Sequence, residues 1–347
     1  MNAFTNYLEK LGSNFLVSAM VPSLAFVVAS ILMFDPILQV AAAFKDPQST
    51  LQLVGFGLIV FILTVVIGFT LTVLNTHILK IFEGHIIFSP LRFLYNKSLR
   101  IHRQKARNLM AQRESLKKEY VSLMKFTDNQ SELDDRLRKI IDEHYKVASE
   151  YDQAYPSNLD DVLPTKFGNT LRAAEDHAVQ RYGFDGVTFW PRLIHVIPDS
   201  YKSTIDSSRN ELSFLANMAI LAVIFSFLSL FAVFYTMTTA TVVSGNIMVF
   251  GTFVRSVMKY FFATILGMIG CGLFYNASII SLESFTLTIR SSFDLFRLDL
   301  LRKLELVRPN DFDEEFDTWT NLNELIVLGN QSLTFQKFAY REEENKK

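Results

Sequence analysis

Four long apolar segments constrain this chain of 347 residues more than any other feature. They cover residues 14–34, 53–74, 214–236 and 260–282, and they contain no Asp, Glu, Lys or Arg. Each has roughly the 20 residues that a helix needs to cross a hydrocarbon core of about 30 Å. The sequence therefore predicts four transmembrane helices. Half of the chain is hydrophobic but 20% is charged, which predicts a sizeable polar part as well.

The first apolar segment has a competing interpretation as a cleaved signal peptide. Ala41, Ala42 and Ala43 resemble a small-residue cleavage site, and Lys10 precedes the segment. The apolar region is too long for a signal peptide and Lys10 is its only leading cation, so an uncleaved anchor is favoured. Pro22 lies inside this segment and is tolerable there if a neighbouring group bonds to the carbonyl that proline leaves free.

Basic residues follow the second apolar segment. Between Lys80 and Arg107 there are seven Lys or Arg residues and one acid, Glu83. Such a block marks the cytoplasmic side of a span, so we expect both termini in the cytoplasm. The formal net charge of −1 says nothing about nucleic acid, and none is expected as a partner. The predicted domains are the transmembrane pairs 1–76 and 213–282 and the cytoplasmic parts 77–212 and 283–347.

Two predicted features open the cytoplasmic part. Residues 78–95 alternate aromatic and basic side chains, typical of an elbow along the membrane surface; a helix end folded back on the domain is an equal alternative. Residues 97–151 carry two heptad seams that predict an antiparallel helical hairpin, folded near residue 129. The seams are Leu99, His102, Ala106, Leu109, Arg113, Leu116, Tyr120 and Leu123, then Leu133, Leu137, Ile140, His144, Val147 and Tyr151.

Residues 156–198 gather charged and aromatic side chains, and we expect them to join the hairpin to the helix that enters the third span. Asn169 and Asp185 are predicted helix N-caps, Gly183 a helix stop, and Trp190 a helix end because proline follows it. Arg172 is predicted to pair with the acid four residues later. The structural or ligand-binding candidates are Asn169, Arg172, Glu175, Asp176, His177, Arg181, Asp185, Trp190 and Arg192.

The fourth span is expected to continue as a cytoplasmic helix that ends at Pro309. Arg290, Asp294 and Arg297 are predicted to form a charge ladder along it. Asp311 is the predicted N-cap of a last helix. That helix is predicted to bury Phe312, Trp319, Leu322 and Ile326.

The second transmembrane pair holds two further candidate sets. Arg255 and Lys259 are either snorkelling side chains or a cationic ring at a pore mouth. Ala263, Gly267 and Cys271 repeat every four residues, so another helix, from this chain or a second copy, can approach closely.

Motifs of catalysis are missing from the sequence: it has no phosphate-binding loop, nucleophile elbow or zinc-protease motif. Acid-acid-histidine triplets occur at 142–144 and 175–177, but adjacent helical residues point about 100° apart and cannot close on one metal. The only cysteine is Cys271, which excludes an intramolecular disulfide. We therefore predict no catalytic residue, metal or cofactor.

Three places resemble one uncharacterised group of multi-span bacterial membrane proteins. They are GNTLRAAEDHAVQRYGFDGVTFWPRL (168–193), LKIFEGH (79–85) and SSFDLFRLDLLRKL (291–304). The resemblance implies a bacterial origin and a membrane location, which would be the inner membrane. It implies no activity.

Together these features predict an all-α integral membrane protein with four transmembrane helices and a cytoplasmic helical domain that contains the hairpin. The leading functional prediction is a non-enzymatic, homo-oligomeric scaffold or signalling component whose partners are the lipid bilayer and a cytoplasmic protein. The main alternative is an ion channel or pore-forming effector, in which Arg255, Lys259, Asn276 and the threonines of the second span face a lumen. A membrane hydrolase that uses Glu175 or Asp176 beside Trp190 is the third.

Overall fold

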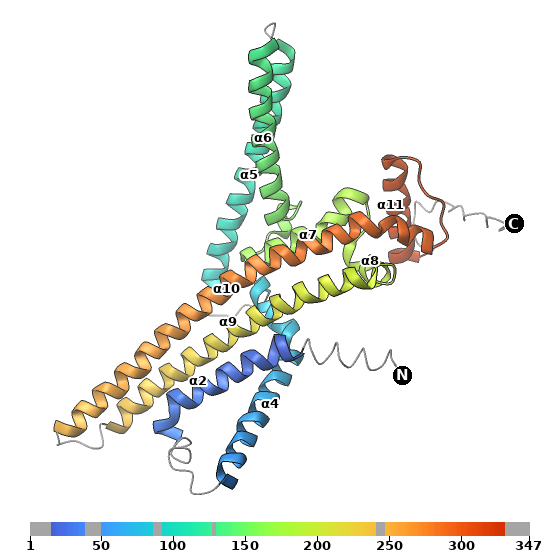
Figure 1. The fold of residues 1–347 in the computed structure, drawn as a ribbon. Helices are drawn as coiled ribbons and strands as arrows, with labels where there is room; N and C mark the ends of the chain where they lie inside the picture. Colours follow the sequence, from blue (N-terminus) through green and yellow to red (C-terminus); the bar gives the residue numbers. More distant parts are fainter. Residues whose placement is uncertain (1–14, 39–49, 86–91, 127–129, 241–246, 330–347) are drawn as a thin grey trace, which may run out of the picture. The chain divides into compact units, whose positions relative to one another are not determined.

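The computed structural model describes residues 15–38, 50–85, 92–126, 130–240 and 247–329, and the regular elements in these ranges are all helical (Figure 1). The chain is therefore all-α in its described part. The elements are η1 (Leu16–Met20), α2 (Val21–Leu38), α4 (Thr50–Glu83), α5 (Arg92–Phe126), α6 (Gln130–Ala154), η3 (Leu159–Asp161), α7 (Lys166–Tyr182), α8 (Gly186–Leu193), α9 (Asp199–Ala240), α10 (Ile247–Lys303) and α11 (Phe312–Leu328).

Among the described residues, four helices are long and apolar enough to cross a membrane, as predicted. They are Leu16–Phe34, Val54–Glu83, Asp199–Thr239 and Phe253–Lys303. The last two have 41 and 51 residues, well beyond the roughly 20 that one span needs. The chain divides into two compact units: unit 1 comprises 1–79 and 207–281, and unit 2 comprises 80–206 and 282–347.

In unit 1, Pro22 is accommodated by a π-helical turn and by a neighbouring side chain. The turn Leu16–Met20 directly precedes it, and the N–H of Val21 bonds to the carbonyl of Leu16. Pro22 has no N–H for the carbonyl four residues earlier, that of Ser18. The side-chain amide of Asn217 on α9 donates an N–H (Nδ2) to this oxygen at 2.7 Å. A proline inside a span is expected to need such a neighbouring donor.

The small-residue ridge of α10 packs within the chain at its central position. A Cβ atom at Gly267 would overlap Ser226 Oγ and lie 3.1 Å from the carbonyl oxygen of Ala222, both on α9. Ala263 is buried and Cys271 is half-buried. The close approach at Gly267 is therefore an α9–α10 contact of this chain.

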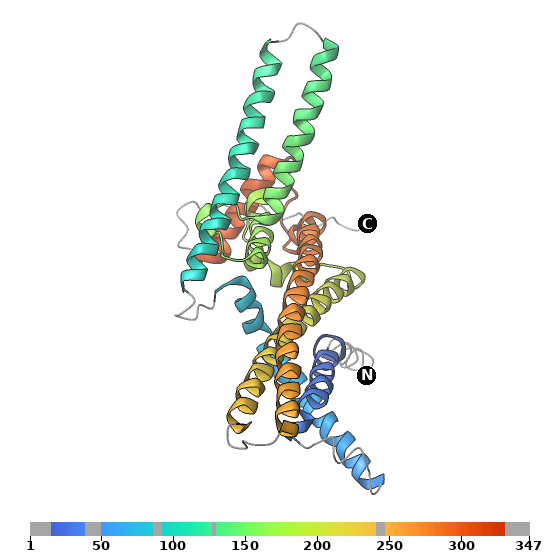
Figure 2. The ribbon, with the colours of Figure 1, turned by 90° about the vertical axis from the view of Figure 1, so that its left-hand side faces the viewer.

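In unit 2, α5 and α6 lie side by side (Figures 1 and 2). Lys105 and Glu150 form an ion pair of 3.7 Å between them. The side chain of Leu133 lies outside the described residues. The buried cluster between the two helices contains many of the predicted seam residues, among them Ala106, Leu109, Leu116, Ile140, Val147 and Tyr151.

The larger core of unit 2 surrounds Trp319 of α11, which is fully buried. The rings of Phe184 and Phe189 lie 4.5 and 5.5 Å from the Trp319 ring, centroid to centroid. Phe293 and Leu300 of α10 complete the cluster. This core holds α7, α8, α10 and α11 together and positions the charged residues of the 156–198 stretch.

The predicted end of α8 and the predicted buried face of α11 are wrong. The short helix α8 does not end at Trp190 but runs through Pro191 to Leu193, because Phe189 and Leu193 are both fully buried and hold the turn in place. Phe312 is 71% exposed, since it starts α11 beyond the edge of the core. Glu315, three residues later on the same face of α11, is buried instead.

Helix α10 ends at Lys303, six residues before the predicted stop at Pro309. Glu305 takes a left-handed conformation (φ 60°), and the N–H of Leu306 bonds to the carbonyl of Leu301 at 3.1 Å. Leu306 is buried, which completes a left-handed helix ending with an apolar contact. Packing of Leu306 therefore ends the helix before proline can.

The predicted membrane-surface elbow is described only in part. Helix α4 ends at Glu83, and Gly84 follows with φ 86°. The N–H groups of Gly84 and His85 bond to the carbonyls of Ile81 and Lys80, both at 3.0 Å, so glycine stops the helix as expected. Other predictions lie outside the described residues: the remainder of the elbow at 86–91, the signal-peptide site at 41–43 with Lys10, and the fold-back at 129.

Candidate functional site

The predicted cap of α7 is wrong: Thr165, not Asn169, caps this helix. Thr165 Oγ1 accepts the N–H of Gly168 at 2.9 Å, so the helix starts one turn earlier than predicted. Asn169 is fully buried inside the helix. Its Oδ1 accepts the N–H of Leu163 at 2.7 Å, and its Nδ2 donates to the carbonyls of Leu163 and Thr165, both at 2.8 Å. Asn169 thus fixes the loop that enters α7.

The acids of α7 find partners other than those predicted. Arg172 Nη1 lies 2.9 Å from Glu175 Oε2, and this hydrogen bond raises the pKa of Arg172. Asp176 Oδ2 instead accepts the N–H and the hydroxyl of Ser157, both at 3.0 Å. The predicted pair of Arg172 with Asp176 is therefore wrong, because Asp176 is bonded to Ser157 in the loop before η3.

His177 and Tyr182 of α7 bind one carboxylate of α10. Asp294 Oδ1 lies 2.8 Å from His177 Nε2 and accepts the Tyr182 hydroxyl at 2.7 Å. Burial, together with the hydrogen bond to Asp294, raises the pKa of Tyr182 far above its usual range. The guanidinium of Arg297 lies 4.2 Å from the centre of the Tyr182 ring, close enough for a cation–π contact.

A buried ion pair replaces the charge ladder predicted along α10. Arg297 Nε lies 2.7 Å from Glu315 Oε1 of α11, with side chains 12% and 8% exposed. Trp319 Nε1 donates to the same oxygen at 3.4 Å. Arg290 donates Nη2 to the backbone carbonyl of Asp152 at 2.9 Å. Arg290 and Arg297 therefore bind groups of other helices, because they lie at the edge of a core rather than in solvent.

Asp185 is the N-cap of α8, as predicted. Its carboxylate accepts the N–H groups of Val187 and Thr188, both at 3.2 Å. Trp190 is half-buried against Phe293, with the ring centroids 5.9 Å apart. Both residues have structural contacts here.

Arg192 and Arg181 are the remaining candidate cations in residues 156–198, and they differ in their contacts. Arg192 donates Nη1 to the carbonyl of Thr188 at 2.8 Å, and its guanidinium lies 5.9 Å from the Phe189 ring centre. Arg181 is exposed. Within the described residues no group of three or more His, Cys, Asp or Glu side chains is placed to hold a metal ion.

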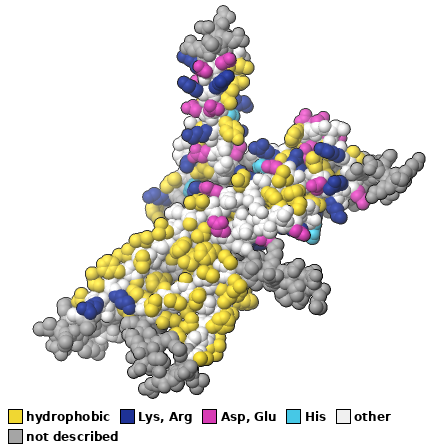
Figure 3. Space-filling model, viewed as in Figure 1, with side chains coloured by type: hydrophobic (Ala, Val, Ile, Leu, Met, Phe, Trp, Pro, Cys, Tyr) yellow, Lys and Arg dark blue, Asp and Glu magenta, His cyan; other side chains and the backbone are white. Residues whose placement is uncertain are grey.

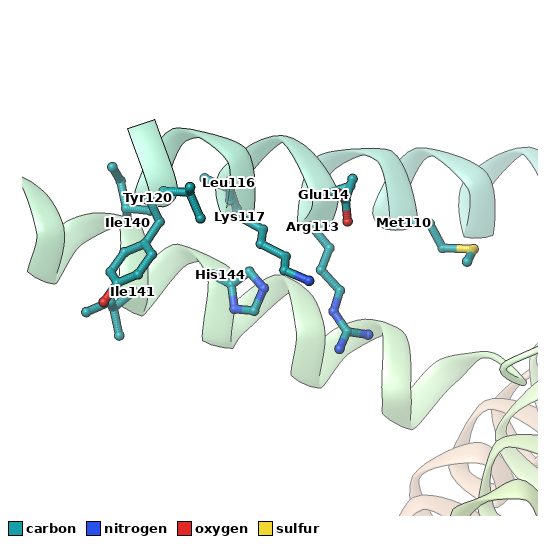
Figure 4. A pocket seen from close by; sticks show the side chains of 10 residues that line it. Met110, Arg113, Glu114, Leu116, Lys117, Tyr120, Ile140, Ile141 and His144 are labelled. Atoms are coloured by element: carbon teal, nitrogen blue, oxygen red, sulfur yellow. The ribbon is translucent and has the colours of Figure 1, made fainter. Parts of the chain in front are cut away.

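A groove of about 640 Å³ runs between α5 and α6 (Figure 4). Its walls are largely apolar, with Met110, Tyr120 and Ile141 among the lining residues. Figure 4 shows the side chain of Lys117 pointing from α5 toward His144 of α6, and that of Arg113 reaching α6 farther along the helix. Arg113 and His144 thus line one groove. The acid that pairs with Arg113 is Asp152, at 3.5 Å.

A histidine–tyrosine contact joins α5 to the end of α6. His102 Nδ1 lies 3.2 Å from the hydroxyl of Tyr155, which directly follows the helix. Burial lowers the pKa of His102 and raises that of Tyr155 to about 12. Both groups are therefore held in their neutral forms near neutral pH, which suits a contact between two helices.

The polar groups assigned to a pore lumen bond to backbone carbonyls in unit 1. Lys259 Nζ donates to the carbonyl of Met33 at 2.9 Å, and Asn276 Nδ2 donates to that of Gly272 at 2.9 Å. Arg255 is exposed. The hydroxyls of Thr64, Thr70 and Thr72 in the second span donate to the carbonyls of Val60, Val66 and Gly68.

Sequence reasoning missed the structural roles of Asn217, Asp294 and Glu315. The signal for Asn217 and Glu315 is a polar residue inside an apolar segment or stripe, where burial demands a partner. Asp294 is exposed and gives no such signal. No family model, curated protein or solved structure matches the chain.

Proposed function

We propose that this chain is a non-enzymatic membrane-anchored scaffold or signalling component, whose α5–α6 pair is a cytoplasmic antiparallel hairpin that binds a protein partner. One observation carries the proposal: exposed apolar side chains of both helices line a groove beside the seam that α6 already fills. The basic block from Lys80 to Arg107 supports a cytoplasmic hairpin and cytoplasmic termini. The bacterial inner membrane and a homo-oligomeric state belong to the same proposal, and the resemblance of residues 168–193 supports the bacterial origin.

The groove lies next to the filled seam. Leu109 and Leu116 of the seam are 9% and 7% exposed, whereas Met110 and Val121 are 38% and 44% exposed. Ile141 of α6 is 50% exposed and lines the same groove. An apolar patch beside a filled seam gives a further helix a surface to pack on. We assign this patch to a helix of the partner.

The charge around the groove defines the chemistry of that partner. Arg113, Lys117 and His144 line the groove, with Glu114 as the acid. An amphipathic helix with acidic residues beside its apolar stripe would complement both the apolar walls and the cationic side chains. We therefore propose an acidic amphipathic helix as the ligand.

Site-specific photo-crosslinking in the full-length membrane protein tests this proposal. A crosslinker in place of Val121 should capture a protein that contains such a helix. A crosslinker in place of Glu119 is the matched control, because residues two apart on a helix face nearly opposite sides. Val121→Ser and Lys117→Glu should each weaken binding of the captured protein by roughly fivefold or more, as expected for the centre of an interface.

Two results would contradict the proposal. Equal capture at positions 119 and 121 would show that the groove does not select the partner. Capture of a second copy of this chain at 121 would make the groove a self-contact and remove the partner.

A further inference from the structure

Besides the α5–α6 groove of unit 2, the protein has a groove in unit 1 that is bounded by three of the apolar helices. It has a volume of about 500 Å³ and lies between α2, α9 and α10. Ala29 and Leu32 of α2, Phe225 of α9, and Phe262 and Leu266 of α10 are among its lining residues. Because these helices are long and apolar enough to span a membrane, the groove would open toward hydrocarbon.

Two cations lie on the same face of α10 as the groove. Arg255, Lys259, Phe262, Leu266 and Ile269 follow one another at spacings of four, three, four and three residues, which places them on one helix face. Phe262, Leu266 and Ile269 are 60%, 68% and 55% exposed. The face is therefore polar at one end and apolar along the rest, like an amphiphile.

Lys259, the cation nearer the groove, bonds to one of the residues that line it. Lys259 Nζ donates to the carbonyl of Met33, a lining residue of the groove, at 2.9 Å. It also lies 5.6 Å from the centre of the Tyr260 ring. Figure 3 shows a small group of Lys and Arg side chains near one end of the hydrophobic surface over the apolar helices. The ammonium group is thus held at the mouth of the groove.

The stretch of α10 from Lys259 to the last groove-lining residue matches one leaflet of a bilayer in length. From Lys259 to Ile269 the helix rises by about 15 Å, at about 1.5 Å per residue. A hydrocarbon core of about 30 Å gives about 15 Å to each leaflet. A lipid with its headgroup at Lys259 would therefore have room for an acyl chain along the groove.

We infer that this face binds an anionic glycerophospholipid, with the phosphate between Arg255 and Lys259 and an acyl chain in the groove. A transmembrane helix of a second copy fits less well, because it would cover two cations with apolar side chains, and burying unpaired charge in a membrane is costly. A phosphate brings the compensating charge, and its acyl chain covers the exposed apolar residues.

Lipid binding to the purified full-length chain in nanodiscs tests the inference. Anionic phosphatidylglycerol should remain bound in native mass spectra and raise the unfolding temperature relative to zwitterionic phosphatidylcholine. Arg255→Gln and Lys259→Gln should each lower phosphatidylglycerol affinity by about fivefold, the usual effect of one cation near an anionic lipid surface. Arg255→Lys should retain binding.

A groove-filling variant separates the acyl chain from the headgroup. Ala29→Phe should reduce phosphatidylglycerol binding although both cations are intact, whereas Val54→Phe, on the exposed surface of α4, should leave it unchanged. Three results would overturn the inference: equal stabilisation by the two lipids, equal stabilisation by inorganic phosphate alone, or a change of oligomeric mass in Ala29→Phe without loss of bound lipid.

Discussion

A single amide inside an apolar helix joins the first span to the third. Asn217 is 2% exposed and donates to the carbonyl of Ser18, four residues before Pro22. Proline has no N–H to offer that carbonyl, and in hydrocarbon there is no water to bond to it. The amide of one span therefore bonds beside the proline of another.

The variant Asn217→Leu should destabilise the protein by about 1–2 kcal/mol, the usual range for an interhelical hydrogen bond in a membrane or for an orphaned buried acceptor. The matched control is Asn276→Leu, because Asn276 bonds to a carbonyl of its own helix. Thermal unfolding of the full chain in detergent measures both. Equal losses in the two variants would show that the contact with Ser18 has no special weight.

At the scale of elements, α11 is attached to α10 by an apolar core and one ion pair. Trp319 fills the core, and Glu315 receives both Arg297 and the Trp319 N–H. Both charged side chains are nearly buried, so each depends on the other for compensation. We therefore expect the pair to favour one docking of α11, and its removal as a whole to cost less than the loss of one member.

Replacing one member of this pair should show that dependence. Arg297→Met alone leaves a buried carboxylate and should cost about 3–5 kcal/mol, whereas Arg297→Met with Glu315→Leu should recover much of the loss. The exposed pair Arg302–Asp299 supplies the control, and Arg302→Met should cost less than about 1 kcal/mol. Denaturant unfolding of the parent protein and these three variants decides; a double variant no more stable than Arg297→Met alone would refute the coupling.

At the scale of the whole molecule, helices rather than linkers connect the two units. Helices α4, α9 and α10 each contribute residues to both units. The exposed surface of unit 1 includes many large apolar side chains, as expected for contact with lipid. The exposed surface of unit 2 carries both signs of charge (Figure 3).

The proposed topology predicts which positions a membrane-impermeant maleimide can reach. In a Cys271→Ala background, Ser244→Cys lies between the third and fourth apolar segments and should be labelled in intact cells. Lys337→Cys, in the C-terminal tail, should be labelled only after permeabilisation, because the basic block after the second span holds its side in the cytoplasm. The reverse labelling pattern would show that the protein has the opposite membrane topology.

The sequence by itself determined the helices of this protein. Charge-free segments of about 20 residues define the spans, and heptad spacing identifies buried residues such as Leu116 and Ile140. Local caps were also predictable, at Asp185, Gly183 and Asp311. All these properties depend on residues within a few positions of each other, so a linear pattern contains them.

Only the tertiary structure decided which polar groups meet. His177 and Asp294 are 117 positions apart, and Asn217 and Ser18 are 199 apart. The local rules instead predicted neighbours, such as the ladder along α10, and were wrong there. A buried polar or charged group bonds to the partner that core packing brings within hydrogen-bond distance, even when that partner is far away in the sequence. Desolvation makes it costly to leave such a group without a partner.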